Sequence, residues 1–147
     1  MNTVRIERDA RGVARLTLAR ADKRNALSSE MIAELREAGV PVRGYVSCVT
    51  DCPYEGPVVP EAVAKVSDEL FRMGCFEISL GDTIGQGTPE RVDAMLSAVS
   101  DVIPVEALAG HFHDTAGRAL ENVAVALARG VRVFDSAVGG LGGCPYA

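Results

Sequence analysis

The fold is decided by residues 75–117, CFEISLGDTIGQGTPERVDAMLSAVSDVIPVEALAGHFHDTAG. Two mainly apolar runs, at 75–83 and 108–117, flank the segment 88–103, whose apolar residues recur at helical spacing. Thr88 stands where the N-cap of that helix belongs. A buried strand, a helix and a second buried strand in this order predict a parallel βαβ unit with a right-handed crossover.

The same alternation continues on both sides of this unit. Residues 42–49 predict the preceding strand and 60–74 its helix, while 118–130 predict a further helix and 131–146 a last strand that runs into a glycine-rich loop. Three βα units and one strand make an α/β fold of the TIM type, a partial (β/α) barrel with about half of the eight strands. Such a piece leaves strand edges and one apolar face uncovered, so we expect a homo-oligomer.

A different pattern precedes the barrel. Residues 3–20 alternate between apolar and polar side chains around a turn and predict a β-hairpin. Residues 28–38 predict a short amphipathic helix with Ser28 as its N-cap. The expected domains are therefore residues 1–37, the hairpin with its helix, and residues 38–147, the partial barrel.

Composition excludes several classes of function. The 147 residues carry a net charge of -5, with 15 Lys and Arg interspersed among 20 Asp and Glu, which argues against nucleic-acid binding. We find neither a membrane-spanning apolar run nor an apolar signal segment, so we expect a cytoplasmic protein without a membrane partner. Four cysteines fit neither a disulfide scaffold nor a zinc pair and are expected as free thiols: Cys48, Cys52, Cys75 and Cys144.

The triplet His111-Phe112-His113 is the most informative local feature. Because side chains alternate along a strand, both imidazoles project to one face, where they could bind one cation. Most such triplets hold ordinary polar or buried histidines without a ligand, and that alternative stays open.

Two further residues lie where barrel chemistry is expected. Asp82 ends the preceding strand, where a carboxylate could act as a general base, or could simply cap a helix or turn. Cys144 lies in the glycine-rich loop 139–146, where its thiol could protonate a carbanion-like intermediate. The alternative for this loop is an inert flexible terminus.

Four segments together resemble 3-hydroxy-3-methylglutaryl-CoA (HMG-CoA) lyases, in the same order and with family-like spacing. They are RGYVSCVTDCPYEG (43–56), MGCFEISLGDTIGQGTP (73–89), GHFHDTAGRALEN (110–122) and DSAVGGLGGCPYA (135–147). The resemblance covers about residues 38–147. It implies a divalent-metal lyase that cleaves HMG-CoA to acetoacetate and acetyl-CoA, a step of leucine degradation.

Through this resemblance individual residues acquire expected roles. His111 and His113 correspond to ligands of Mg or Mn, Asp82 to the acid near the reacting hydroxyl, Cys144 to the mobile-loop thiol, and Tyr45 to a side chain that lines the pocket. The family's Arg-Asp pair on its first strand and its asparagine ligand beyond the loop cysteine have no counterpart in these 147 residues, so the resemblance is C-terminally truncated. We therefore expect weak metal binding and impaired activity. The alternatives are an inactive fusion remnant that folds by self-association and an acyl-CoA-binding fragment.

The N-terminal segment VARLTLARADKRNALSSEMIAEL (13–35) is similar to the opening of enoyl-CoA hydratase (crotonase) family proteins. That resemblance implies that Lys23 and Arg24 meet CoA phosphates, whereas an exposed basic loop is the alternative. The catalytic part of that family has no counterpart here. The sequence thus predicts a crotonase-like fragment, about residues 1–37, fused to a lyase-like one.

Overall fold

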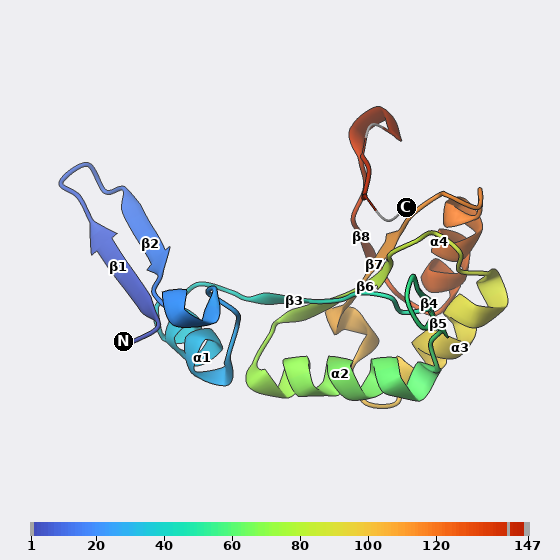
Figure 1. Ribbon diagram of the computed structural model, residues 1–147, viewed down its shortest axis with the longest axis horizontal. Helices are drawn as coiled ribbons and strands as arrows, with labels where there is room; N and C mark the ends of the chain where they lie inside the picture. Colours follow the sequence, from blue (N-terminus) through green and yellow to red (C-terminus); the bar gives the residue numbers. More distant parts are fainter. Residues whose placement is uncertain (1, 141, 146–147) are drawn as a thin grey trace.

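The protein is described by a computed structural model over residues 2–140 and 142–145. Its N-terminal part is an antiparallel hairpin followed by a short helix, as the sequence predicts (Figure 1). The elements are β1 (Val4–Arg8), β2 (Ala14–Leu18), the 3₁₀ turn η1 (Ala21–Lys23) and α1 (Ser29–Glu37).

The remaining chain forms a four-stranded parallel sheet whose strands lie side by side in chain order, β3-β6-β7-β8. Chain-order parallel strands joined by helices are the arrangement of a (β/α) barrel, and four strands are half of one. The elements are β3 (Arg43–Val46), α2 (Pro60–Met73), β6 (Glu77–Asp82), α3 (Pro89–Ser100), β7 (Leu108–Phe112), α4 (Ala119–Ala128) and β8 (Val133–Phe134). The expected fold class is therefore confirmed.

Smaller elements that the sequence did not indicate lie in the connections. They are the two-residue hairpin strands β4 (Asp51–Cys52) and β5 (Gly56–Pro57) and the 3₁₀ turns η2 (Val105–Ala107) and η3 (Val138–Gly140). Within the described residues, no helix is both long enough and apolar enough to cross a bilayer.

Local signals place the helix ends. The Thr88 hydroxyl accepts a hydrogen bond from the Arg91 amide at 3.4 Å, and the Ser28 hydroxyl accepts one from the Met31 amide at 3.2 Å. Both residues satisfy an amide that the first turn of a helix leaves without a partner. Gly74, at φ +103°, ends α2 in a conformation that side chains rarely adopt.

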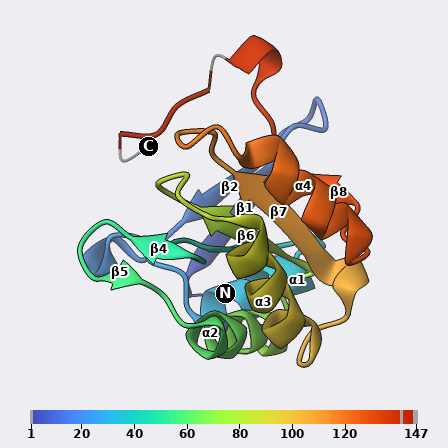
Figure 2. The same cartoon turned by 90° about the vertical axis from the view of Figure 1, so that its right-hand side faces the viewer.

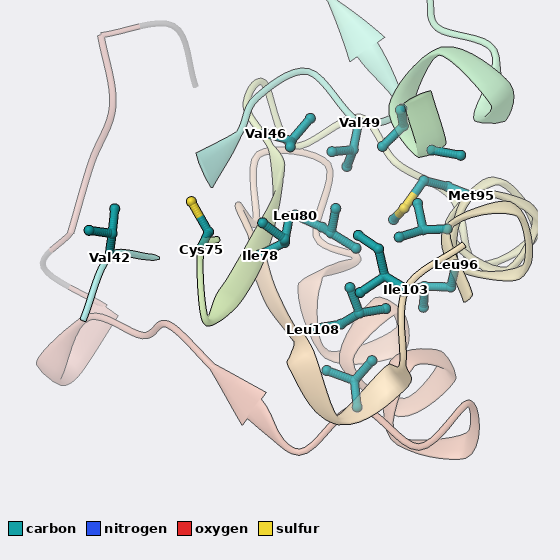
Figure 3. Close-up of a cluster of buried hydrophobic side chains, with 14 of the residues drawn as sticks. Val42, Val46, Val49, Cys75, Ile78, Leu80, Met95, Leu96, Ile103 and Leu108 are labelled. Carbon is teal, nitrogen blue, oxygen red and sulfur yellow. The ribbon is translucent and has the colours of Figure 1, made fainter. Parts of the chain in front are cut away.

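The hydrophobic core lies between the sheet and its helices (Figure 3). Ile78 and Leu80 of β6 point to this side, where they meet Met95 and Leu96 of α3, and each of these side chains is at most 1% exposed. Figure 2 shows α2, α3 and α4 gathered along the sheet. Because these helices cover one face, the face that remains open is the one that would line the inside of a barrel.

That inner face is polar. Arg43 of β3 forms ion pairs with Glu77 of β6 at 2.5 Å and with Asp135 beyond β8 at 2.7 Å, and the Ser79 hydroxyl donates to Asp135 at 3.0 Å. The expectation of an uncovered apolar face is therefore wrong. Strand alternation sends the apolar residues to the helices and leaves charged and polar residues inside.

The Glu34 carboxylate of α1 binds the start of the N-terminal hairpin, beside the apolar packing of Val4 in the core. Glu34 accepts hydrogen bonds from the amides of Asn2, Thr3 and Val4 at 2.6 to 2.9 Å. Burial alone would raise the pKa of Glu34, but these donors outweigh it and lower the pKa from 4.5 to about 2. The hairpin is thus held to the helix by an ionised side chain.

Candidate active site

Two imidazoles meet at the carboxyl end of β7. His111 lies within the strand and His113 directly beyond it, and the H-x-H spacing places both rings on the inner side, with ring centroids 5.0 Å apart. Their Nε2 atoms face each other at 3.1 Å. The two rings thus converge on one point.

The partners of the opposite ring nitrogens determine the tautomers. His111 Nδ1 lies 3.0 Å from a carboxylate oxygen of Asp135, and His113 Nδ1 lies 2.7 Å from the Thr83 carbonyl oxygen. A carbonyl and an ionised carboxylate can only accept, so both Nδ1 atoms donate. In the neutral rings both Nε2 atoms therefore carry lone pairs, which repel at this distance unless a cation or proton lies between them.

The separation of the two Nε2 atoms fits a shared metal ion. Imidazole-metal bonds of about 2.1 Å at a right angle place two nitrogens about 3 Å apart. The hydrogen bonds that hold His111 and His113 from behind are the kind that orient metal-binding histidines. Among the described residues no cluster of three or more His, Cys, Asp or Glu could hold a metal, so the pair would be only part of a ligand set.

Asp135 is a site residue that sequence reasoning missed. Burial alone would raise its pKa, but hydrogen bonds from Arg43, His111 and Ser79 outweigh that and lower the pKa below its ordinary value of 3.8. The carboxylate is therefore ionised at neutral pH. The available signal was an aspartate inside the predicted last strand segment, 131–146, next to the strand that carries His111.

A pocket of about 280 Å³ opens over the two imidazoles. It brings together four of the residues predicted from the sequence: Tyr45, His111, His113 and Cys144. Tyr45 accepts a hydrogen bond from Arg43 at 2.6 Å, and the guanidinium lies 5.0 Å from the centre of its ring. The other lining residues are Val46, Ser47, Gly81, Thr83, Gly143 and Pro145.

Asp82 lies on the other side of the sheet from this pocket. Its side chain is fully buried, and its oxygens accept hydrogen bonds from the Thr50 hydroxyl at 2.9 Å and the Gly87 amide at 2.8 Å. Because Gly81 faces the pocket, the next residue along the strand faces the helices. The structure therefore does not bring the predicted acid to the imidazoles; the carboxylate that contacts them belongs to Asp135.

Lys23 and Arg24 are not brought to the pocket either. Both are exposed, in the segment between β2 and α1. Figure 1 shows that segment at the opposite end of the molecule from β7 and β8. The separation follows from β3, which leads away from α1 into the sheet.

A larger hollow, of about 380 Å³, lies on the outer surface between α2 and α3. Its lining includes Glu61, Lys65, Asp68 and Asp101, but no histidine or cysteine. Because it offers neither an imidazole nor a thiol, the smaller pocket over the imidazoles is the better candidate for chemistry.

Comparison with known proteins identifies similar proteins for most of the chain. It matches the HMGL-like family over residues 14–144, a match that begins ahead of the boundary expected near residue 38. It is 60% identical over 111 residues to the hydroxymethylglutaryl-CoA lyase of Pseudomonas mevalonii, covering 76% of this chain and 37% of the relative. It is 62% identical over 112 residues to the mitochondrial hydroxymethylglutaryl-CoA lyase of Arabidopsis thaliana, covering 76% and 24%.

Solved structures agree with these sequence matches. The crystal structure of the HMG-CoA lyase from Brucella melitensis superposes with a TM-score of 0.79 at 60% identity, covering 81% of this chain and 42% of that one. The HMG-CoA lyase of Acinetobacter baumannii, in complex with coenzyme A and 3-methylmalate, gives a TM-score of 0.75 at 35% identity, covering 88% and 42%. The carboxyl transferase domain of Rhizobium etli pyruvate carboxylase, 19% identical with a TM-score of 0.62, shares the fold.

The chain spans about a quarter to two fifths of the length of these relatives. Within that span the sequence match and the fold match agree. The chain therefore belongs to the HMGL-like family.

Proposed function

We propose that this chain provides the two-histidine wall and the loop thiol of a site that cleaves HMG-CoA into acetoacetate and acetyl-CoA with Mg or Mn. One observation carries the proposal: the Nε2 atoms of the two imidazoles lie 3.1 Å apart in a pocket that Cys144 also lines. The relatives whose segment it matches are hydroxymethylglutaryl-CoA lyases at about 60% identity.

The proposed chemistry divides between the metal and the side chains. When bound, the divalent cation would polarise the hydroxyl and carboxylate oxygens of the substrate. His111 and His113 would hold it. A base, for which Asp82 is the predicted candidate, would take the hydroxyl proton. The bond between the carbinol carbon and the acetyl-CoA carbon would then break, the carbinol carbon would become the ketone carbon of acetoacetate, and the electron pair would stay on the acetyl-CoA carbon. Cys144 would then donate its proton to that carbon.

The substrate is proposed to be an acyl-CoA. Support comes from the Acinetobacter baumannii relative, whose structure is a complex with coenzyme A and 3-methylmalate. Tyr45 would line the wall beside the acyl group. Asp82 as the acid near the reacting hydroxyl stays a prediction, because its carboxylate would first have to leave Thr50 and Gly87.

We also propose that residues 1–37 are a crotonase-like unit joined to a lyase-like one at residues 38–147. The separate two-stranded sheet β1-β2 supports a distinct unit, whereas the family match from residue 14 argues against a sharp boundary. Lys23 and Arg24 would bind CoA phosphates only if the CoA reached that end of the molecule. A cytoplasmic location stays a prediction, since relatives include cytoplasmic and mitochondrial proteins.

A second candidate is a chain that folds by self-association and does not cleave HMG-CoA by itself. The observation that favours it is the absence of a third His, Cys, Asp or Glu ligand beside the two imidazoles in the described part of the chain. Mg and Mn prefer oxygen ligands, so two imidazoles alone would bind them weakly. Homo-oligomers would also cover the open edges of β3 and β8.

A chimera tests the proposed function directly. Residues 38–147 replace the matched segment of the Pseudomonas mevalonii lyase, and acetoacetate formation from HMG-CoA is measured with Mn²⁺. We expect cleavage that His111→Ala abolishes. Cys52→Ala, which alters a half-buried thiol that does not line the pocket, should leave it intact. A folded chimera that binds Mn²⁺ and forms no acetoacetate would overturn the proposal.

A further inference from the structure

The Asp135 carboxylate contacts three side chains of the inner face. One carboxylate oxygen receives the Arg43 guanidinium at 2.7 Å, and the other receives His111 Nδ1 and the Ser79 hydroxyl, each at 3.0 Å. The Asp135 amide also donates to the Gly110 carbonyl oxygen at 3.0 Å, which fixes the backbone beside β7. The carboxylate is therefore held in place from strands β3, β6 and β7.

Charge neutralisation of Arg43 does not by itself explain this arrangement. Arg43 already has an ion pair with Glu77 at 2.5 Å, so Asp135 brings a second negative charge to one guanidinium. The excess negative charge lies directly behind the imidazole of His111. A carboxylate in that position makes the imidazole a stronger ligand and favours a cation in front of it.

We propose that Asp135 is a positioning residue, which holds His111 in the Nδ1-H tautomer so that its Nε2 lone pair faces the shared cation. This inference rests on the proposed metal centre and goes beyond it, because it names the residue that keeps the centre able to bind. His113 is held by a different hydrogen bond, from its Nδ1 to the Thr83 carbonyl oxygen 2.7 Å away. The two hydrogen bonds act on different rings and come from different parts of the chain, Thr83 beyond β6 and Asp135 beyond β8.

Asp135→Asn gives a test that separates tautomer control from simple structural support. The amide oxygen would stay with Arg43, which can only donate, and the NH₂ group would then face His111 Nδ1. His111 would switch to the Nε2-H tautomer and donate to His113 Nε2, 3.1 Å away. Neither Nε2 atom would then offer a free lone pair to a cation, although asparagine keeps the shape of the Asp135 side chain.

The first measurement reads the tautomers in the whole 147-residue protein without metal, from ¹⁵N shifts of labelled histidines. We expect a hydrogen on Nδ1 of both rings in the wild type, whether or not the two Nε2 atoms share a further proton. Asp135→Asn should convert His111 alone to Nε2-H, and Asp135→Ala should give a mixture at His111. His113 is the internal control. An Nε2-H tautomer of His111 in the wild type, or an unchanged tautomer in both variants, would overturn the proposal.

The second measurement is a Mn²⁺ titration by calorimetry. Asp135→Asn is expected to weaken binding by roughly 10- to 100-fold, as for other residues that orient metal-binding histidines. Glu77→Gln removes the same charge from the same ion cluster without contact with either imidazole, and we expect it to change affinity much less. Equal losses in the two variants would contradict the positioning role. Wild-type protein that binds no Mn²⁺ would count against the metal centre, while the tautomers would still decide the role of Asp135.

Discussion

Gly81 of β6 is the register partner of His111 of β7, so no side chain stands beside the imidazole on that strand. A Cβ atom at this position would lie 3.4 Å from the Val46 carbonyl oxygen, which is an ordinary contact. An alanine would therefore fit here, and the glycine leaves space on the pocket side of β6.

Gly81→Val is expected to fill part of the pocket and weaken Mn²⁺ binding, because overpacking at a close contact costs about 1–3 kcal/mol. Gly81→Ala is the matched control and should retain most of the affinity. Calorimetric titration of both variants, with circular dichroism to verify folding, measures the difference. Unchanged Mn²⁺ affinity in the valine variant would show that ligands do not enter beside this strand.

Asp82→Ala is expected to destabilise the fold, since it leaves the buried Thr50 hydroxyl and Gly87 amide without their acceptor. Each buried group left without a partner costs about 1–3 kcal/mol. Asp82→Asn should stay near wild-type stability, because its amide can accept from Gly87 and donate to Thr50. Urea unfolding measures both variants. In the chimera, a stable Asp82→Asn protein that has lost cleavage would restore the predicted catalytic role.

Cys144 is expected to react with iodoacetamide faster than Cys75, on the order of tenfold or more, since alkylation requires an accessible thiolate. Cys75 is 2% exposed, and burial raises the pKa of its thiol. Cys144 is half-buried at the pocket edge. Mass spectrometry of the peptides after timed labelling gives both rates. Labelling in urea is the control, in which the two rates should converge.

The attachment of the hairpin to α1 is expected to weaken in acid. The pKa of Glu34 is about 2 in the folded protein and 4.5 ordinarily, so its stabilising contribution is complete above pH 4.5 and disappears as the pH falls toward 2. The measurement is the difference in Tm between wild type and Glu34→Gln across this range. It should be largest above pH 4.5 and shrink below it. A difference that does not vary with pH would assign the effect to packing.

Much of the fold could be predicted because its signals are local. Ser28 and Thr88 cap the helices that follow them, and each cap depends only on residues within one turn. The hairpin, the βα alternation and the shared face of His111 and His113 likewise follow from short-range periodicity. The small hairpin β4-β5 was missed, since two-residue strands carry no periodicity.

The order of strands and helices, and the shared side of the two imidazoles, could thus be predicted from the residues alone. The carboxylate that contacts His111 could be identified only from the packing of the strands. Asp82 is the register partner of Phe112, between the two histidines, yet its side chain points to the helices. Asp135 lies 24 residues beyond His111 in the chain and contacts it because β7 and β8 are neighbouring strands. Alternation along a strand predicts which residues share a face but not which face the helices cover, and only strand register brings distant residues together.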